Sequence, residues 1–158
     1  MLEGVKMEFQ WNENVKIDVR DLQGNLIDTT QFHNQVHDPG LNYLAKSLAS
    51  STFDMKIRYL AWGSSSSTGS NSDTVMSTEG GRKAVTSAAT SNTGVVYTVV
   101  YLSPTEATTN IKELAWFASS SATAVAGTGT MISRVIYDRT KTALESITIT
   151  RTDTFSTG

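Results

Sequence analysis

The sequence contains no cysteine and few residues of the other types that build metal and redox sites. Without cysteine, disulfides, thiolate zinc sites and thiol nucleophiles are excluded together, and the redox compartment stays open. Histidine occurs only twice, and charged residues make up 18% of the chain. Stability must therefore come from packing or from assembly.

A strong net charge and long apolar runs are also missing. The formal net charge is −2, which gives no basic footprint for nucleic acid and no polybasic patch for an anionic membrane. No stretch approaches the roughly 18 apolar residues of a membrane helix, and the N-terminus lacks the basic start and apolar run of a signal peptide. We therefore expect no nucleic-acid partner, no membrane partner and a soluble chain made in the cytoplasm.

Hydroxyl side chains are present in excess. The chain has 19 Ser and 23 Thr among 158 residues, a bias typical of strands with hydroxylated faces and of Ser/Gly/Thr loops. Its length suits one domain, and we place a single β-rich domain at 13–158. Residues 1–12 show little periodicity and are predicted to form an N-terminal arm, in which Phe9 and Trp11 would clasp a neighbouring subunit.

The periodicity predicts strands around one short helix. Apolar residues alternate with polar ones at 15–20, and residues 95–102 are so apolar that we expect a strand buried on both faces. Asp38 can accept hydrogen bonds from first-turn amides and Pro39 suits the first helical position, so a helix is predicted at about 39–50, with its leucines docked on a sheet. The fold class is mainly β, an antiparallel β-sandwich or barrel of seven to eight strands.

A repeated triplet marks two of these strands. Leu60-Ala61-Trp62 returns as Leu114-Ala115-Trp116, and each triplet is followed by a run of small residues. We interpret the triplets as equivalent strands that share one core. The small-residue segments, 63–73 and 118–129, are predicted to be surface loops that contact a partner.

Searches for catalytic and binding motifs give weak candidates. His33 and His37 have the spacing of helical metal ligands but precede a proline, and serines 64–67 lack a nucleophile elbow and a nearby base. No phosphate-loop motif is present. We therefore predict no enzyme activity, no metal and no cofactor, and we interpret Glu79 with Arg82 as an ion pair across a Gly-Gly turn.

The order of several short motifs resembles one family. The chain has Asn34 to Leu44 opening a helix, an apolar strand with a Ser/Thr/Gly loop at 60–69, Asp73-Thr74 and Glu79-x-x-Arg82. These are followed by Ile-x-Glu-Leu-x-x-Phe at 111–117, Gly-Thr-Met-x-x-Arg at 129–134, and Lys141 ahead of an alternating strand at 145–150. Over residues 15–155 this pattern resembles the small virion structural proteins of tailed bacteriophages, which include head decoration (cement) proteins and related tail-fibre or tail-tip components.

The resemblance implies a non-catalytic protein of the virion. It would bind the major capsid protein on the capsid exterior as a homotrimer, after synthesis in the host cytoplasm, and would stabilise the shell. A tail-fibre or tail-tip adaptor is the first alternative, and a carbohydrate-binding module that uses Trp62 or Trp116 as a stacking platform is the second. The interface candidates are Phe9, Trp11, Trp62, Ser64, Ser65, Ser66, Ser67, Glu79, Arg82, Trp116 and Thr128.

Overall fold

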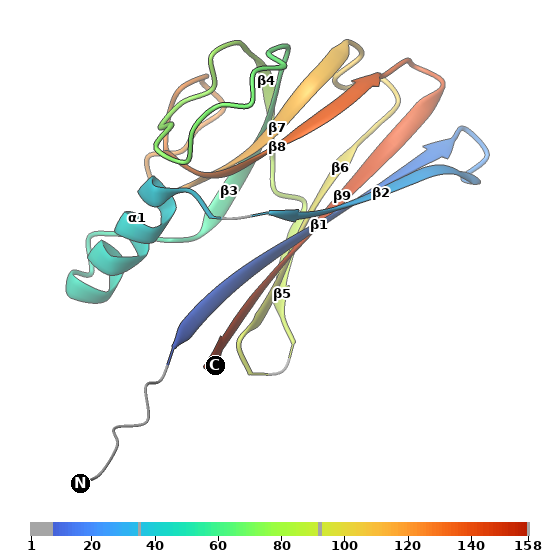
Figure 1. The fold of residues 1–158 in the computed structure, drawn as a ribbon. Helices are drawn as coiled ribbons and strands as arrows, with labels where there is room; N and C mark the ends of the chain where they lie inside the picture. The colour runs from blue at the N-terminus through green and yellow to red at the C-terminus, as the bar shows by residue number, and fades with distance from the viewer. Residues whose placement is uncertain (1–7, 35, 92, 158) are drawn as a thin grey trace, which may run out of the picture.

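The computed structural model describes residues 8–34, 36–91 and 93–157. They form nine strands and one helix: β1 (Phe9–Asp21), β2 (Leu26–Asn34), α1 (Asp38–Ala49), β3 (Ile57–Gly63), β4 (Glu79–Ala84), β5 (Ser87–Thr90), β6 (Val95–Leu102), β7 (Asn110–Ala118), β8 (Thr130–Thr140) and β9 (Glu145–Thr157). The strands form two antiparallel sheets that face each other (Figure 1). The predicted sandwich is confirmed, and no closed barrel forms among the described residues.

The two sheets have five and four strands. Sheet A has the order β2-β1-β9-β6-β5, and sheet B has the order β4-β3-β7-β8. Strands β1 and β9 pair along their whole length, from Phe9 opposite Thr157 to Asp21 opposite Glu145. Strands β4 and β5 are separated by only two residues, so the chain passes there from sheet B to sheet A. This crossing explains why the strand count exceeds the seven or eight predicted.

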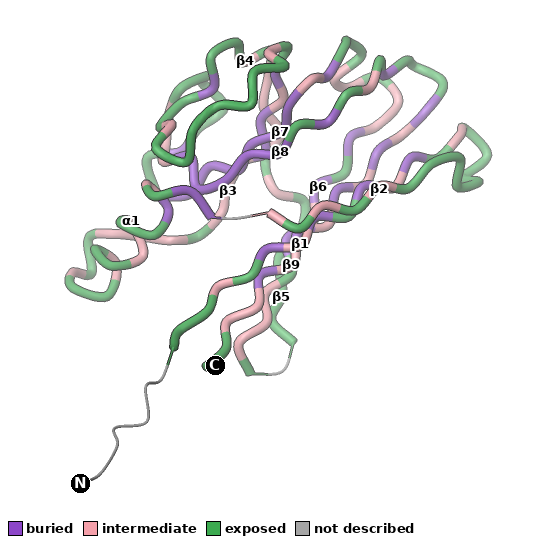
Figure 2. Tube along the Cα trace, in the orientation of Figure 1, coloured by how far each residue is buried: buried purple, intermediate pink, exposed green. Residues whose placement is uncertain are grey.

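The main core lies between the sheets (Figure 2). Alternate residues of β1 point into it and are fully buried, as the period-two pattern predicts. The prediction that 95–102 is buried on both faces is wrong, because Tyr97 and Tyr101 are exposed on the outer face of sheet A. Only the inward-facing residues of β6 reach the core: Thr98, Val100 and Leu102.

The repeated triplets are neighbours, as predicted. Strands β3 and β7 pair so that Leu60 lies opposite Trp116, Ala61 opposite Ala115 and Trp62 opposite Leu114. Leu60, Leu114 and Trp116 belong to the main core. The two alanines point to the opposite face of sheet B, where a second apolar cluster lies.

A charged cluster is buried at the end of this core. The side chain of Arg151 is fully buried and bonds Asp153 at 2.7 and 2.8 Å, with a carboxylate oxygen of Glu13 at 3.3 Å. Desolvation raises the pKa of Glu13, although Arg151 opposes the shift. Trp11 Nε1 donates a 2.8 Å hydrogen bond to Asp153 Oδ1, so the charged cluster also fixes the start of β1.

This contact corrects the predicted domain boundary. Residues 9–12 are part of β1 and pair with β9, rather than forming a separate arm. The remaining predicted arm, residues 1–7, lies outside the described residues.

Helix α1 occupies the predicted segment but packs differently. His37 is the N-cap residue and Asp38 lies in the first turn, so the predicted cap is wrong by one residue. Leu41 and Leu48 are 45% and 83% exposed, so of the predicted leucine face only the half-buried Leu44 faces the sheets, where it lines a cavity with Trp11 and Ile132. Gly40 is the buried helix residue, and an added Cβ there would lie 3.0 Å from the carbonyl oxygen of Ile132 on β8. Among the described residues, no helix has the length and apolar character needed to cross a membrane.

Candidate contact surface on the four-stranded sheet

Two loops cover the outer face of sheet B. Loop 64–78 connects β3 to β4, and loop 119–129 connects β7 to β8. Met76 of the first loop and Ala122 of the second are buried in one cluster with Ala61, Ala115 and Phe117. The two segments that were predicted to be surface loops therefore form a packed third layer, while most of their other side chains face solvent.

A row of four residues crosses sheet B beneath these loops. Ala61 lies opposite Arg82 on one side and Ala115 on the other, and Ala115 lies opposite Arg134. Paired residues point to the same face, so the row reads Arg82, Ala61, Ala115, Arg134 from β4 to β8. The two small residues in the middle leave room for the loops to approach the sheet between two arginines.

The segment 79–82 is a strand, not the predicted turn. The pairing of β3 with β4 shifts between Trp62 and Gly63, so that Trp62 lies opposite Gly81 and Gly63 opposite Glu79. The extra residue, Gly80, forms a bulge and reverses the alternation of side chains. Glu79 and Arg82 consequently share one face, and the predicted ion pair between them is confirmed.

Arg82 holds loop 119–129. Its guanidinium donates to the carbonyl oxygen of Thr128 at 2.7 Å and lies 3.9 Å from the centroid of the Phe117 ring. Glu79 accepts a 3.1 Å hydrogen bond from the amide of Gly127 in the same loop. The Thr128 hydroxyl donates to the carbonyl oxygen of Val125 at 2.7 Å. The ion pair therefore anchors loop 119–129, which follows β7, rather than loop 64–78, which directly precedes Glu79 in the sequence.

Arg134 holds loop 64–78. It bonds Glu113 Oε2 at 3.0 Å and the carbonyl oxygen of Ser67 at 3.1 Å, and Asp73 lies 4.0 Å away. Gly69 makes this approach possible, because a Cβ at that position would lie 1.7 Å from Nη2 of Arg134. Its φ of +62° is also a conformation that glycine adopts most easily.

Both arginine side chains are removed from solvent. The side chain of Arg82 is 0% exposed and that of Arg134 is 4% exposed, and each faces a carboxylate. Burial raises the pKa of Glu113, while the positive charge of Arg134 opposes the shift. The two arginine charges are thus held beneath the loops. The outer surface above them is rich in hydroxyl groups, and Asp73, with its side chain 34% exposed, is the one charged residue of the two loops.

Apart from Trp116, the predicted interface residues divide into three groups. Ser64 to Ser67, Glu79, Arg82 and Thr128 lie together around the two loops, with Ser64, Ser66 and Ser67 exposed. Phe9 and Trp11 lie on sheet A, where Trp11 packs against Phe155 with ring centroids 5.1 Å apart. Trp62 is half-buried against Gly81, where an added Cβ would be 2.4 Å from its ring.

The predicted interface role of Trp116 needs correction. Its side chain is 0% exposed in the main core, so it cannot contact a partner or a sugar on the surface of the folded chain. The interface assignment of Trp116 is therefore wrong, and Trp116 is a residue of the main core.

Sequence reasoning missed the loop anchors at Glu113 and Arg134. Both residues occur in the motifs quoted above, but neither was selected as a candidate. Glu113 directly precedes the apolar run 114–118, and Arg134 lies inside the mostly apolar run 131–137; a charge inside such a run is a detectable sign of a buried ion pair. The exposed valines at the loop surface, Val75 at 54% and Val125 at 67%, were also not selected.

The two histidines lie in different settings, and the ring of His37 contacts the backbone of Asp73 in loop 64–78. His33 is on β2, whereas His37 is the buried N-cap of α1 and donates its amide to the carbonyl oxygen of Ile132 at 2.8 Å. Within residues 8–34, 36–91 and 93–157, no group of three His, Asp or Glu side chains could hold a metal ion. No protein-family model, curated protein or solved structure matches the chain.

Proposed function

We propose that this chain is a structural protein of a tailed-phage virion that decorates the outer surface of the head and stabilises the shell without catalysis. The surface formed by loops 64–78 and 119–129 would contact the major capsid protein. The observation that carries the proposal is the pair of buried arginines, Arg82 and Arg134, which fix both loops on one sheet and leave an outer surface whose one charged loop residue is Asp73.

A fixed surface with a single charged residue suits protein binding better than catalysis. The loops are ordered by contacts inside the chain, so little conformational entropy is lost when they bind. Their exposed hydroxyl groups can form hydrogen bonds with peptide groups of a partner, and Val75 and Val125 offer apolar contact points. The order of motifs along the sequence points to the capsid as that partner and to a homotrimer as the assembled form.

The motif residues have roles consistent with this proposal. Glu79, Arg82, Glu113 and Arg134 anchor the loops, while Lys141 is buried and donates to the carbonyl oxygen of Ser103 at 2.9 Å. Their common role is to hold loop positions.

The alternatives differ in the partner that binds. A tail-fibre or tail-tip adaptor could use the same loop surface and would differ only in its position in the virion. A carbohydrate-binding module would need exposed aromatic rings, and with Trp116 buried only the half-buried Trp62 remains of the rings proposed for stacking. The capsid proposal is therefore preferred over glycan binding.

Co-sedimentation with empty heads tests the proposal. The heads are assembled from the major capsid protein of the phage that carries this chain. Wild-type protein should pellet with them, and Val75→Asp and Val125→Asp should each weaken binding at least about tenfold, because a charge would be placed at the contact. Leu144→Asp is the matched control, since Leu144 is 68% exposed in the turn between β8 and β9 and should bind as wild type. Equal binding by all variants, or none by the wild type, would contradict the proposal.

A further inference from the structure

The four edge strands of the sandwich differ in how they are protected. The edges are β2 and β5 in sheet A, and β4 and β8 in sheet B. An edge strand presents unpaired amide and carbonyl groups, which natural proteins shield with charges, bulges or covering elements. Three of the four edges carry such protection.

The protecting features are specific. Strand β8 is covered at its edge by the start of α1, where the amide of His37 bonds the carbonyl oxygen of Ile132 at 2.8 Å. Strand β4 has the bulge at Gly80 and the charged residues Arg82 and Lys83. Strand β2 has a shifted register next to Val19 and carries Asp28, which pairs with Arg139 at 3.2 Å.

Strand β5 has none of these features, and its protection is limited to its length of four residues. Its sequence is Ser-Ala-Ala-Thr from Ser87 to Thr90, without charge or proline, and all four residues are exposed. Its pairing with β6 is regular over these residues. A groove of about 510 Å³ runs along residues 84–88, on the side of Ser120 and Ala122. The strand itself is therefore uncharged and accessible, while Lys56 and Arg58 line the groove beside it.

The hydrogen-bond pattern identifies the free peptide groups. The amide of Ser91 donates to the carbonyl oxygen of Val95 at 3.2 Å, and these residues close the hairpin between β5 and β6. In an antiparallel ladder, bonded pairs alternate with non-bonded pairs, so Ser87 and Ala89 also direct their peptide groups to β6. The amide and carbonyl groups of Ala88 and Thr90 point to the open edge, where no described residue bonds them.

We propose that β5 is a self-association site, at which two copies of this chain pair antiparallel about a two-fold axis through Ala89. Ala88 of each copy lies opposite Thr90 of the other, and the two pairs exchange about four backbone hydrogen bonds. The two five-stranded sheets then form one continuous sheet.

A second copy fits this edge for reasons of register. Pairing centred on Ala89 places inward-facing Ala88 and Thr90 opposite each other, and outward-facing Ser87 opposite Ser91. Each sheet face therefore continues into the partner, whereas a shift of one residue would place inward side chains opposite outward ones. No charged residue of 87–91 meets a like charge, because the segment contains none.

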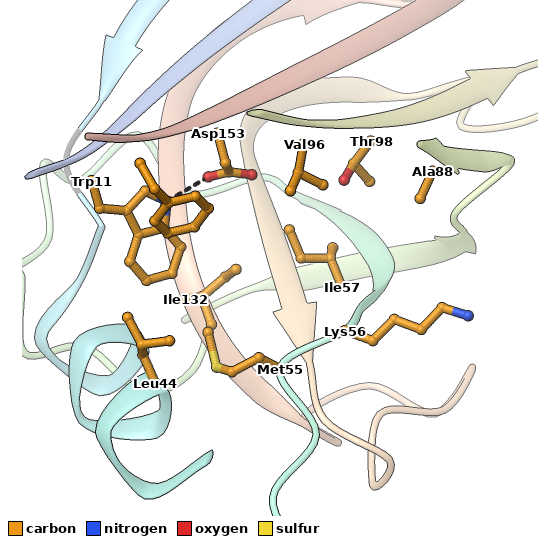
Figure 3. Close-up of a pocket in the computed structure, with 11 residues that line it drawn as sticks. Trp11, Leu44, Met55, Lys56, Ile57, Ala88, Val96, Thr98, Ile132 and Asp153 are labelled. Carbon is orange, nitrogen blue, oxygen red and sulfur yellow. Dashed lines mark hydrogen bonds between the residues drawn. The ribbon is translucent and has the colours of Figure 1, made fainter. Parts of the chain in front are cut away.

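An apolar cavity continues the same surface. It has a volume of about 270 Å³ and lies between the sheets beside β5, with walls that include Trp11, Met55, Val96 and Phe155 (Figure 3). Ala88 lines the cavity from β5. Pairing through β5 would place the cavities of the two copies on the same face of the joined sheet, one on each side of the axis.

This contact is separate from the proposed capsid contact. Strand β5 belongs to sheet A, whereas loops 64–78 and 119–129 cover the outer face of sheet B. The contact is two-fold, and so is also distinct from the three-fold contacts of the expected trimer. Failure of one proposal leaves the other standing.

Disulfide trapping tests the register, because the chain has no cysteine of its own. In the proposed dimer, Ala89 of one copy lies opposite Ala89 of the other copy as a pair that shares no backbone hydrogen bond. The Cα atoms of such a pair are about 4.5 Å apart, which is within the range of a disulfide. Ala89→Cys should therefore form a covalent dimer under mild oxidation, at least about tenfold faster than Ser87→Cys. Ser87, the control residue, lies on the same strand and face, but in the dimer it is about 13 Å along the strand from Ser87 of the other copy. Equal rates for the two variants, or no dimer from either, would overturn the proposal.

A charge exchange provides a second test. Ala89→Lys and Ala89→Glu each place two like charges together at the axis, and each should raise the dimer dissociation constant in sedimentation equilibrium at least about tenfold over wild type. A mixture of the two should recover dimers. Ala143→Lys makes the same change in an exposed turn at the other end of β9 and should leave dimerisation unchanged. A dimer insensitive to the Ala89 variants, or a monomer at all concentrations, would contradict the pairing.

Discussion

Arg82 and Arg134 lie at opposite ends of one residue row across sheet B, and each holds a different loop. Arg82 bonds Thr128 of loop 119–129, and Arg134 bonds Ser67 of loop 64–78. Ala61 and Ala115 separate the two arginines. The two loops can therefore be released independently, although they share one layer.

Replacing either arginine with lysine should free one loop at a time. Lysine keeps the charge but loses the planar set of donors that reaches a carboxylate and a carbonyl together. Arg82→Lys should raise hydrogen exchange in residues 119–129 about tenfold, and Arg134→Lys should do so in residues 64–73, because about one hydrogen bond's stabilisation is lost. Each variant is the control for the other in hydrogen-exchange mass spectrometry. Equal effects on both loops would contradict separate anchoring.

The alanines of the row should not tolerate larger side chains. Ala115 is fully buried under the loop layer, so Ala115→Leu should lower the free energy of unfolding by about 1–3 kcal/mol through overpacking. Ala143→Leu, in an exposed turn, should change it by less than about 0.5 kcal/mol. Urea unfolding gives both values, and similar values for the two variants would show that the space above Ala115 is open.

The start of β1 should contribute to stability. Trp11→Phe keeps an aromatic ring against Phe155 but removes the hydrogen bond to Asp153, so we expect a loss of about 1.5 kcal/mol. Phe9→Leu is the control, because Phe9 is 61% exposed and should matter little. Chemical unfolding measures the free energy of unfolding of both variants. If residues 9–12 were an unpaired arm rather than part of β1, Trp11→Phe would leave that free energy unchanged.

Glu106 should make part of the stability depend on pH. Its hydrogen bond to Lys83, together with the bond from the Ser103 amide, lowers its pKa to about 2. A folded-state pKa below the usual value means that stabilisation is present above about pH 4.5 and is lost as the pH falls toward 2. The stability difference between wild type and Glu106→Gln should therefore shrink between pH 5 and pH 2. A constant difference over that range would contradict the ion pair.

Much of the sandwich could be predicted from sequence because alternation reports which face of a strand is buried. The pattern at 15–19 and the paired triplets located the core correctly. Alternation does not report whether the second face of a sheet is covered, which is why the burial of 95–102 was overestimated. Most of the predicted leucine face stays exposed, because the helix approaches β8 through Gly40, a residue without an apolar side chain, and only Leu44 of the leucines is half-buried.

The loop surface was only partly predictable. Composition placed the loops and the ion pair of Glu79 with Arg82, but two glycines suggested a turn where the chain forms a bulged strand. The anchoring of each loop depends on which strands are neighbours in sheet B, and that information is non-local. Arg134 and Ser67 are 67 residues apart in sequence, and no local pattern joins them.

Cryo-electron microscopy of the intact virion tests the central claim most directly. The account predicts density for this sandwich on the outside of the head, with loops 64–78 and 119–129 facing the major capsid protein and the outer face of sheet A, with Tyr97 and Tyr101, away from the shell. Density for the chain in the tail, or on the head with the loops facing solvent, would contradict it.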